Sequence, residues 1–172
     1  MNRVCQILGI EKPVIQGPMA WISTAPLVAA VSNAGGLGVL GVGFAPEEFI
    51  REQIAATRKM TDKPFAMNVI MIPDNLEHVT KIVVDEKPPV MYADTIAGLD
   101  PGLCRKYFEI WHNAGCKIVV KASFIDDAKI AAEAGADGMI VKGWEGGGHV
   151  TFEATTVLVP QAVDLLEIPV VA

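Results

Sequence analysis

Short runs of consecutive apolar residues recur along the chain and alternate with stretches in which apolar residues have helical spacing. Continuous apolar runs are typical of parallel strands covered by helices, because neither face of such a strand meets water. We therefore expect seven strands, at residues 13–16, 36–41, 65–71, 90–92, 117–120, 138–141 and 169–172.

Helix signals fill the intervals between these runs. Ser23 or Thr24 can cap a helix that has Pro26 in its first turn. The sequence Pro-Glu-Glu at residues 46–48 opens another helix, and Asp-Pro at residues 100–101 opens a third. Glycine in the last turn marks the helix ends, which have the sequences Asn-Ala-Gly, Asn-Ala-Gly and Glu-Ala-Gly at residues 33–35, 113–115 and 133–135.

Repetition of one helix–glycine–strand junction predicts repeated βα units, with six or seven helices in all. Such alternation fits an open doubly wound sheet or a (βα)8 TIM barrel. A complete barrel needs about 250 residues, and Ala172 falls at the end of the seventh expected strand. We therefore predict an α/β fold, a single incomplete TIM-barrel domain over residues 1–172 that is truncated after about strand 7.

The composition of the chain limits the classes of molecule that it is expected to bind. Half of the residues are hydrophobic (51%), which argues against disorder, and the net charge of −6 with no basic run argues against nucleic acid. We expect a small-molecule substrate. No apolar run reaches the roughly 18 residues of a membrane helix, and the N-terminus lacks a signal-peptide pattern, so we expect a cytoplasmic protein without membrane contact. Cys5, Cys104 and Cys116 lack the spacing of a zinc site or disulfide framework, and we expect buried thiols and no metal.

Residues 36–41, Gly-Leu-Gly-Val-Leu-Gly, match the dinucleotide fingerprint G-x-G-x-x-G. In that motif the glycines follow a strand and open a helix whose N-terminus meets the pyrophosphate. Here they follow an expected helix and lie within an expected strand. We therefore interpret them as glycines that allow close packing at a helix–strand junction.

Three other segments lie at the carboxyl ends of expected strands, where barrels build their chemistry. Gln-Gly-Pro-Met-Ala-Trp at residues 16–21 can bring backbone amides against a flat ligand, or be an ordinary loop. Asn68 interrupts an apolar strand, so its amide is either satisfied by backbone or reserved for a ligand. The strongest segment is residues 143–149, where a glycine run precedes His149, a natural general acid or base.

Together these segments resemble the nitronate monooxygenase family, also called 2-nitropropane dioxygenase, which includes the FMN-dependent enoyl-acyl-carrier-protein reductases of type II. The resemblance spans the whole chain and rests on four motifs in order: residues 16–21, residues 33–38, Lys63-Pro-Phe with Asn68, and residues 145–149 followed by Thr155-Thr156. It implies an FMN-containing (βα)8 barrel with a small inserted lid. This chain would lack the lid and the C-terminal strand and helices of the barrel.

The resemblance also implies site roles. Gly17, Pro18 and Met19 would lie along the flavin ring, and Asn68 would bind its polar edge. Lys121 matches a family lysine near the flavin. Gly147 and Gly148 would pass close to the cofactor. His149 would face the substrate as the catalytic group.

His149 has two roles open to it. In nitronate monooxygenases the matching histidine acts as a base or binds the nitro group, and O2 reoxidises the flavin. In the reductases, NAD(P)H reduces FMN, the flavin gives hydride to the β-carbon of an enoyl thioester, and an acid protonates the α-carbon. We take nitronate oxidation as the leading function and enoyl-thioester reduction as the alternative. A third interpretation is a non-catalytic barrel fragment. A homodimer is also compatible with the sequence, which does not decide the oligomeric state. We expect the 172-residue chain alone to be inactive, because the phosphate-binding loops after strands 7 and 8 would follow residue 172.

Some positions depart from the family pattern. Lys142 stands where relatives often have an acidic residue. Residues 92–98 replace a Gly-rich loop, Thr151 replaces a common glycine, and the glycine before Gly147 and Gly148 replaces an alanine or serine. The change at residues 92–98 puts the substrate preference in doubt, and Lys142 is expected to alter contacts to the flavin or to a bound cation.

Overall fold

A computed structural model describes residues 2–96, 98–149 and 151–172 of the chain. Six strands form one parallel sheet in the order in which they occur in the sequence. Residues 13–16, expected to be a strand, make only one parallel bridge, between Ile15 and Leu37. The strands are β1 (Gly38–Leu40), β2 (Phe65–Ile70), β3 (Val90–Asp94), β4 (Lys117–Ala122), β5 (Gly138–Val141) and β6 (Val170–Val171).

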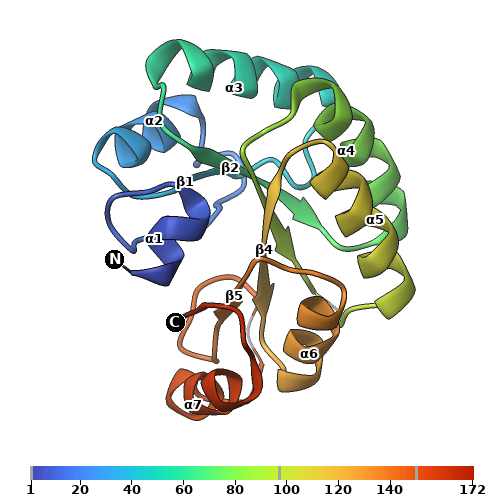
Figure 1. Ribbon diagram of the computed structural model, residues 1–172. Helices are drawn as coiled ribbons and strands as arrows, with labels where there is room; N and C mark the ends of the chain where they lie inside the picture. Colours follow the sequence, from blue (N-terminus) through green and yellow to red (C-terminus); the bar gives the residue numbers. More distant parts are fainter. Residues whose placement is uncertain (1, 97, 150) are drawn as a thin grey trace.

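Seven helices occur in the described residues, and all but α1 form an arc outside the sheet (Figure 1). Sequential parallel strands with a helix between each pair are the arrangement of a TIM barrel rather than of a doubly wound sheet. The expected α/β barrel architecture is confirmed. The helices are α1 (Arg3–Leu8), α2 (Ala25–Asn33), α3 (Glu47–Met60), α4 (Pro73–Glu86), α5 (Pro101–Asn113), α6 (Ile125–Glu133) and α7 (Thr155–Leu165). None of them is long and apolar enough to cross a membrane.

The three repeated helix ends form the same C-cap. Gly35, Gly115 and Gly135 have φ values of 93°, 93° and 101°, in the left-handed region that glycine adopts without strain. Each following amide donates to a carbonyl five residues back, as Cys116 does to Trp111 at 3.0 Å. This is the Schellman motif, and it turns each helix back toward the next strand.

Side chains of the strands alternate between two apolar layers. Those facing outward pack under the helices, and those facing inward fill the barrel near its N-terminal end. The inner group includes Val39, Ala66, Val90 and Val119, with Val4 and Leu8 of α1 packed against them. We did not expect α1, because six residues are too few for a periodic signal. It covers the N-terminal end of the barrel and leaves the carboxyl end for the site.

The glycines of the fingerprint-like sequence lie where the chain packs closely. A Cβ on Gly38 would stand 2.2 Å from the carbonyl oxygen of Val28 in α2. A Cβ on Gly41 would stand 2.2 Å from the carbonyl oxygen of Met19. Glycine is therefore required by helix and loop packing against β1, and our interpretation of residues 36–41 is confirmed.

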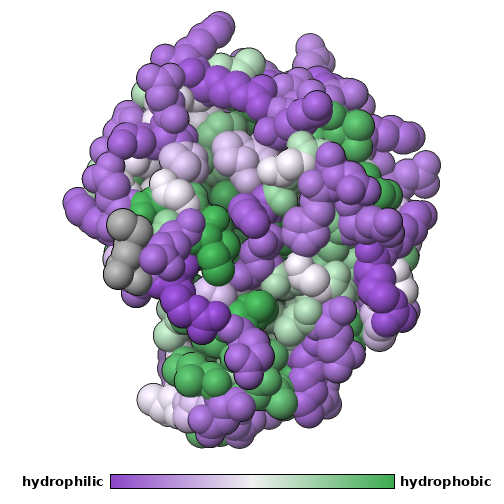
Figure 2. All heavy atoms as spheres, in the orientation of Figure 1, coloured by the Kyte–Doolittle hydropathy of each residue, from purple (hydrophilic) through white to green (hydrophobic). Residues whose placement is uncertain are grey.

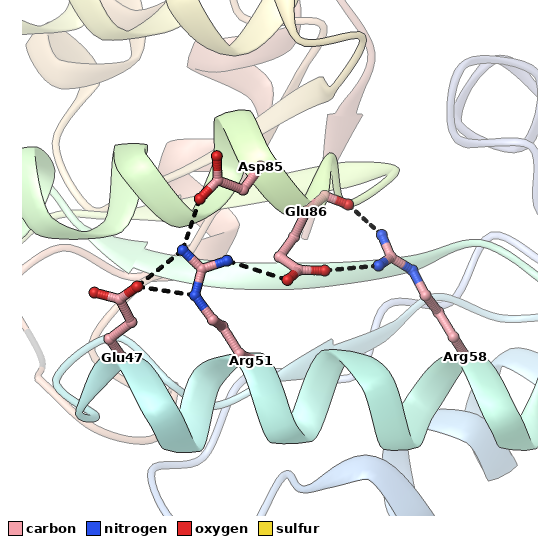
Figure 3. A network of polar contacts seen from close by, with 5 residues as sticks. All are labelled: Glu47, Arg51, Arg58, Asp85 and Glu86. Carbon is pink, nitrogen blue, oxygen red and sulfur yellow. Dashed lines mark hydrogen bonds and ion pairs between the residues drawn. The ribbon is translucent and has the colours of Figure 1, made fainter.

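A network of ion pairs joins α3 to α4 (Figure 3). Arg51 contacts Glu47 at 2.8 Å, Asp85 at 2.7 Å and Glu86 at 3.1 Å. Arg58 binds the other carboxylate oxygen of Glu86 at 2.9 Å. Two arginines sharing one carboxylate fix the relative position of these helices more firmly than an isolated surface pair would.

All three cysteines are buried, as expected, and burial raises the pKa of Cys104 and of Cys116 to about 11. Neither thiol is therefore a nucleophile at neutral pH. His112, near the end of α5, is exposed but has a partner, because its Nε2 lies 2.9 Å from Oδ2 of Asp137.

Candidate active site at the carboxyl end of the barrel

A cavity of about 590 Å³ opens at the carboxyl ends of the strands. It brings together all eight residues that the sequence singled out, from four separate parts of the chain. Side chains that sequence reasoning did not select line it too. The lining residues are Gln16, Gly17, Pro18, Met19, Ala20, Gly43, Phe44, Asn68, Ile70, Tyr92, Asp94, Lys121, Lys142, Gly147, Gly148 and His149.

The loop after residue 16 is tied to β1 by two side chains. The amide of Gln16 donates to Oγ of Ser23 at 2.8 Å, and its oxygen accepts from the backbone amide of Val39 at 3.0 Å. Ser23 is buried, and its hydroxyl also accepts from the backbone amide of Met19 at 3.0 Å. These bonds hold Gly17, Pro18 and Met19 along one wall of the cavity.

The side-chain amide of Asn68 is satisfied by backbone at one of its two ends. Its Oδ1 accepts a hydrogen bond of 2.6 Å from the backbone amide of Gly43. Its Nδ2 makes no hydrogen bond within the described residues, and Asn68 borders the cavity. Gly43 must be glycine, because a Cβ there would stand 2.8 Å from Oδ1 of Asn68. One end of the amide is thus satisfied by backbone, and the donor end has no partner among the described residues.

Lys121 projects from β4 beside an acidic residue that sequence reasoning missed. Asp94 is its register partner on β3, and Lys121 Nζ lies 2.6 Å from Asp94 Oδ1. Only 6% of the Lys121 side chain is exposed, so the pair is largely buried. Tyr92 lies two residues earlier on the same inward face. Burial, together with the Asp94 charge, raises the pKa of Tyr92, so its phenol stays neutral at physiological pH.

The glycine-rich loop after β5 is anchored to the first residue of α7. Glu145 accepts from the backbone amide of Thr155 at 3.0 Å and from its hydroxyl at 2.9 Å. Hydrogen bonds to the loop and to Thr155 lower the pKa of Glu145. The loop ends at His149, which is exposed at the mouth of the cavity.

A Cβ on Gly17, Gly147 or Gly148 would meet no described protein atom within 4 Å. Packing therefore does not require glycine at these three positions, although Gly148 has a φ of 77° that favours it. All three glycines line the cavity. Bare backbone at these three positions leaves room beside the cavity for a flat ring, such as the isoalloxazine ring that the family resemblance implies. The described residues hold no cluster of metal-binding side chains.

The sequence profile of the family described as nitronate monooxygenase matches residues 1–88 and 73–172, which together cover the chain. The chain belongs to the nitronate monooxygenase family. Probable nitronate monooxygenases of Staphylococcus aureus are 29–30% identical over 211 aligned residues, which cover 99% of this chain and 59% of theirs.

Two further relatives are more similar in sequence. FabK from Thermotoga maritima superposes with a TM-score of 0.90 at 37% identity, over 99% of this chain and 53% of FabK. A (3aS,4S,5R,7aS)-5-hydroxy-7a-methyl-1-oxo-octahydro-1H-indene-4-carboxyl-CoA dehydrogenase of Rhodococcus jostii is 34% identical over 167 residues, 97% of this chain and 46% of that protein.

A nitroalkane oxidase from Streptomyces ansochromogenes has a TM-score of 0.82 at 23% identity, over 98% of this chain and 60% of the oxidase. This likeness concerns the fold alone. The chain spans about half the length of the relatives it matches. Its family membership places the cavity in a barrel of the nitronate monooxygenase family.

Proposed function

We propose that this chain, extended to the full length of its relatives, is an FMN-dependent oxidoreductase that oxidises alkyl nitronates with O2. The observation that carries the proposal is the convergence of His149, the free amide of Asn68, the Lys121 ammonium and bare glycine backbone on one cavity of about 590 Å³. Bound FMN would supply the two-electron redox chemistry.

Each of these groups has a defined task under this proposal. Gly17, Gly147 and Gly148 would bind the faces and edges of the ring through backbone. Asn68 would donate from Nδ2 to a polar atom at the ring edge. Lys121 would hold positive charge where electrons accumulate, and Asp94 fixes the position of its ammonium.

His149 would contact the substrate. The mouth of the cavity exposes its imidazole, which can accept a proton from carbon or donate a hydrogen bond to the nitro oxygens. Both tasks suit an imidazole, whose ring nitrogens can accept a proton or donate a hydrogen bond. Among the described residues lining the cavity, His149 is the one histidine.

The visible absorption spectrum of the purified, desalted protein tests the cofactor. We expect flavin peaks near roughly 370 and 450 nm, typical of a bound flavin. A chain extended to full length that stays colourless after incubation with FMN would contradict the proposal. The expectation that the 172-residue chain has no activity by itself is tested on that chain, and turnover of a nitronate by it would overturn the expectation.

Enoyl-thioester reduction with NAD(P)H is a second candidate. It is favoured by the higher identity to FabK (37%) and to the Rhodococcus jostii enzyme named for a carboxyl-CoA compound (34%) than to the Staphylococcus aureus proteins. In this reaction His149 would donate a proton rather than accept one. Oxygen uptake with a nitronate supports the first function, and anaerobic NAD(P)H oxidation with an enoyl thioester supports the second.

Cytoplasmic location and a homodimer belong to the same proposal. Cell fractionation tests the location, and sedimentation equilibrium tests the oligomeric state.

A further inference from the structure

Lys142 binds the backbone of the loop that carries His149. It is the first residue after β5, and its Nζ donates to the carbonyl oxygens of Gly147 and of His149, each at 2.5 Å. Within the described part of the chain these are the only hydrogen bonds that residues 147–149 make. One ammonium therefore holds the segment that forms this wall of the cavity.

The loop is also shaped to cross the stem of the same lysine. A Cβ on Gly146 would stand 2.4 Å from Cγ and 2.5 Å from Cδ of Lys142. Glycine at 146 lets the backbone pass directly over the lysine methylenes. Glu145 and Thr155 fix the near end of the loop, and beyond its far end the Thr151 hydroxyl donates to the carbonyl oxygen of Ser123 at 3.3 Å. Consecutive glycines lose more conformational freedom on ordering than any other residues, so residues 147–149 need a specific restraint.

We propose that Lys142 is a positioning residue, which fixes the backbone of residues 147–149 and thereby the imidazole of His149 at the cavity mouth. The part that concerns catalysis rests on the proposed function above. Lysine suits this task because its ammonium has three donors and no acceptor, and carbonyl oxygens only accept. The ionised acidic residue that the family pattern favours at position 142 could not donate to these carbonyls.

The charged groups around Lys142 define its setting. Burial and the nearby Lys121 ammonium lower the pKa of Lys142, and Asp94 partly offsets them. Lys142 has no carboxylate within ion-pair distance among the described residues, whereas Lys121 has Asp94. Lys142 thus uses its donors on backbone rather than on a counter-ion.

Backbone ¹⁵N relaxation of the flavin-free protein tests the proposal. We expect order parameters of about 0.85 at Gly147 and Gly148 in the wild type and below about 0.6 in Lys142→Met, which keeps the stem and removes the donors. Lys81→Met, at an exposed lysine on α4, is the matched control and should leave the loop rigid. Unchanged order parameters in Lys142→Met overturn the proposal.

Gly146→Ala provides a second route if Lys142→Met does not fold. It keeps the lysine and pushes a methyl group into its stem, so the same two glycines should become mobile; a rigid loop in this variant contradicts the proposal. In active protein, Lys142→Met should lower kcat by 10- to 100-fold and change the Kd for FMN less than threefold. Loss of kcat with a rigid loop would assign Lys142 another role and overturn this one. Failure of the wild type to bind FMN would instead refute the proposed function, and the relaxation data would still decide the role of Lys142.

Discussion

Lys121 and Asp94 lie opposite each other in the register of β4 and β3, and their charged atoms are 2.6 Å apart. Oδ1 of Asp94 makes no well-directed hydrogen bond, so the contact is an ion pair. Lys121 also donates to the carbonyl oxygen of Thr95 at 3.2 Å. The charged pair thus stands inside the barrel, directly above the apolar layer that α1 closes from below, and it separates the packed core from the cavity.

Replacing Lys121 by Met should destabilise the protein by about 1–3 kcal/mol, because it leaves a partly buried carboxylate without its counter-ion. Urea unfolding measures the change. The double variant Lys121→Met with Asp94→Asn should lose less than the sum of the single variants, since neither charge is then unpaired. Additive losses would show that the pair contributes no coupling energy.

Replacing His149 by Ala should lower turnover by about 10²–10⁴-fold, the usual contribution of a general acid or base. His149 is exposed and packs against little, so the midpoint of thermal unfolding should stay within about 2 °C of wild type. His78→Ala is the matched control, because His78 lies on α4 away from the cavity and should be silent in both assays. Equal activity of the two variants would remove His149 from the mechanism and favour the non-catalytic interpretation of the barrel.

The sequence predicted the barrel well because each βα unit repeats local signals. Apolar runs located six of the seven extended segments as strands, and the Ala-Gly helix ends located three C-caps. The exception was residues 13–16, where Lys12, Pro13 and Gln16 flank a single bridging residue, and the sheet partner is met only at Ile15. Local pattern cannot tell a bridge from a strand, because the difference lies in distant pairing.

The site was predicted less completely, for a physical reason. Glycine runs and a histidine in a loop are visible in sequence, and all eight selected residues do meet at one cavity. Asp94 and Tyr92 were missed because they lie in an apolar strand and gain their importance from the register with β4. The alternation Val90, Tyr92, Asp94 along β3 was the available signal, since it shows polarity rising toward the carboxyl end of one face.

Two variants of Asn68 should separate its structural bond from its bond to a ligand. Asn68→Asp keeps an oxygen that accepts from the amide of Gly43 and loses the donor, whereas Asn68→Ala loses both. We expect the Kd for FMN to rise about tenfold or more in either variant, equivalent to about 1.4 kcal/mol. Only Asn68→Ala should also lower the free energy of unfolding, by about 1–3 kcal/mol. Flavin titration and urea unfolding measure the two effects, and unchanged FMN affinity in Asn68→Asp would contradict a role for Nδ2.

Asp137 provides a pH-dependent test at the opposite end of the barrel. Its carboxylate binds His112 Nε2 at 2.9 Å, Lys117 Nζ at 2.9 Å and the backbone amide of Ile118 at 2.8 Å. Burial alone would raise the pKa of Asp137, but these bonds overcome it and hold the pKa below its usual value of 3.8. A lowered pKa means that the unfolded chain binds the proton more tightly, so the stabilisation is fully present above pH 3.8 and is lost as the pH falls through the folded value.

Asp137→Asn should therefore be less stable than the wild type at pH 7, by about 1–3 kcal/mol. The difference should shrink as the pH is lowered below about 4, because the wild-type carboxyl then becomes neutral too. Urea unfolding of both proteins from pH 7 to pH 3 measures this convergence. Asp126→Asn, at a carboxylate whose side chain is 85% exposed on α6, is the control and should follow the wild type throughout. A stability difference for Asp137→Asn that stays constant with pH would mean that packing, rather than the charge, accounts for the contribution of Asp137.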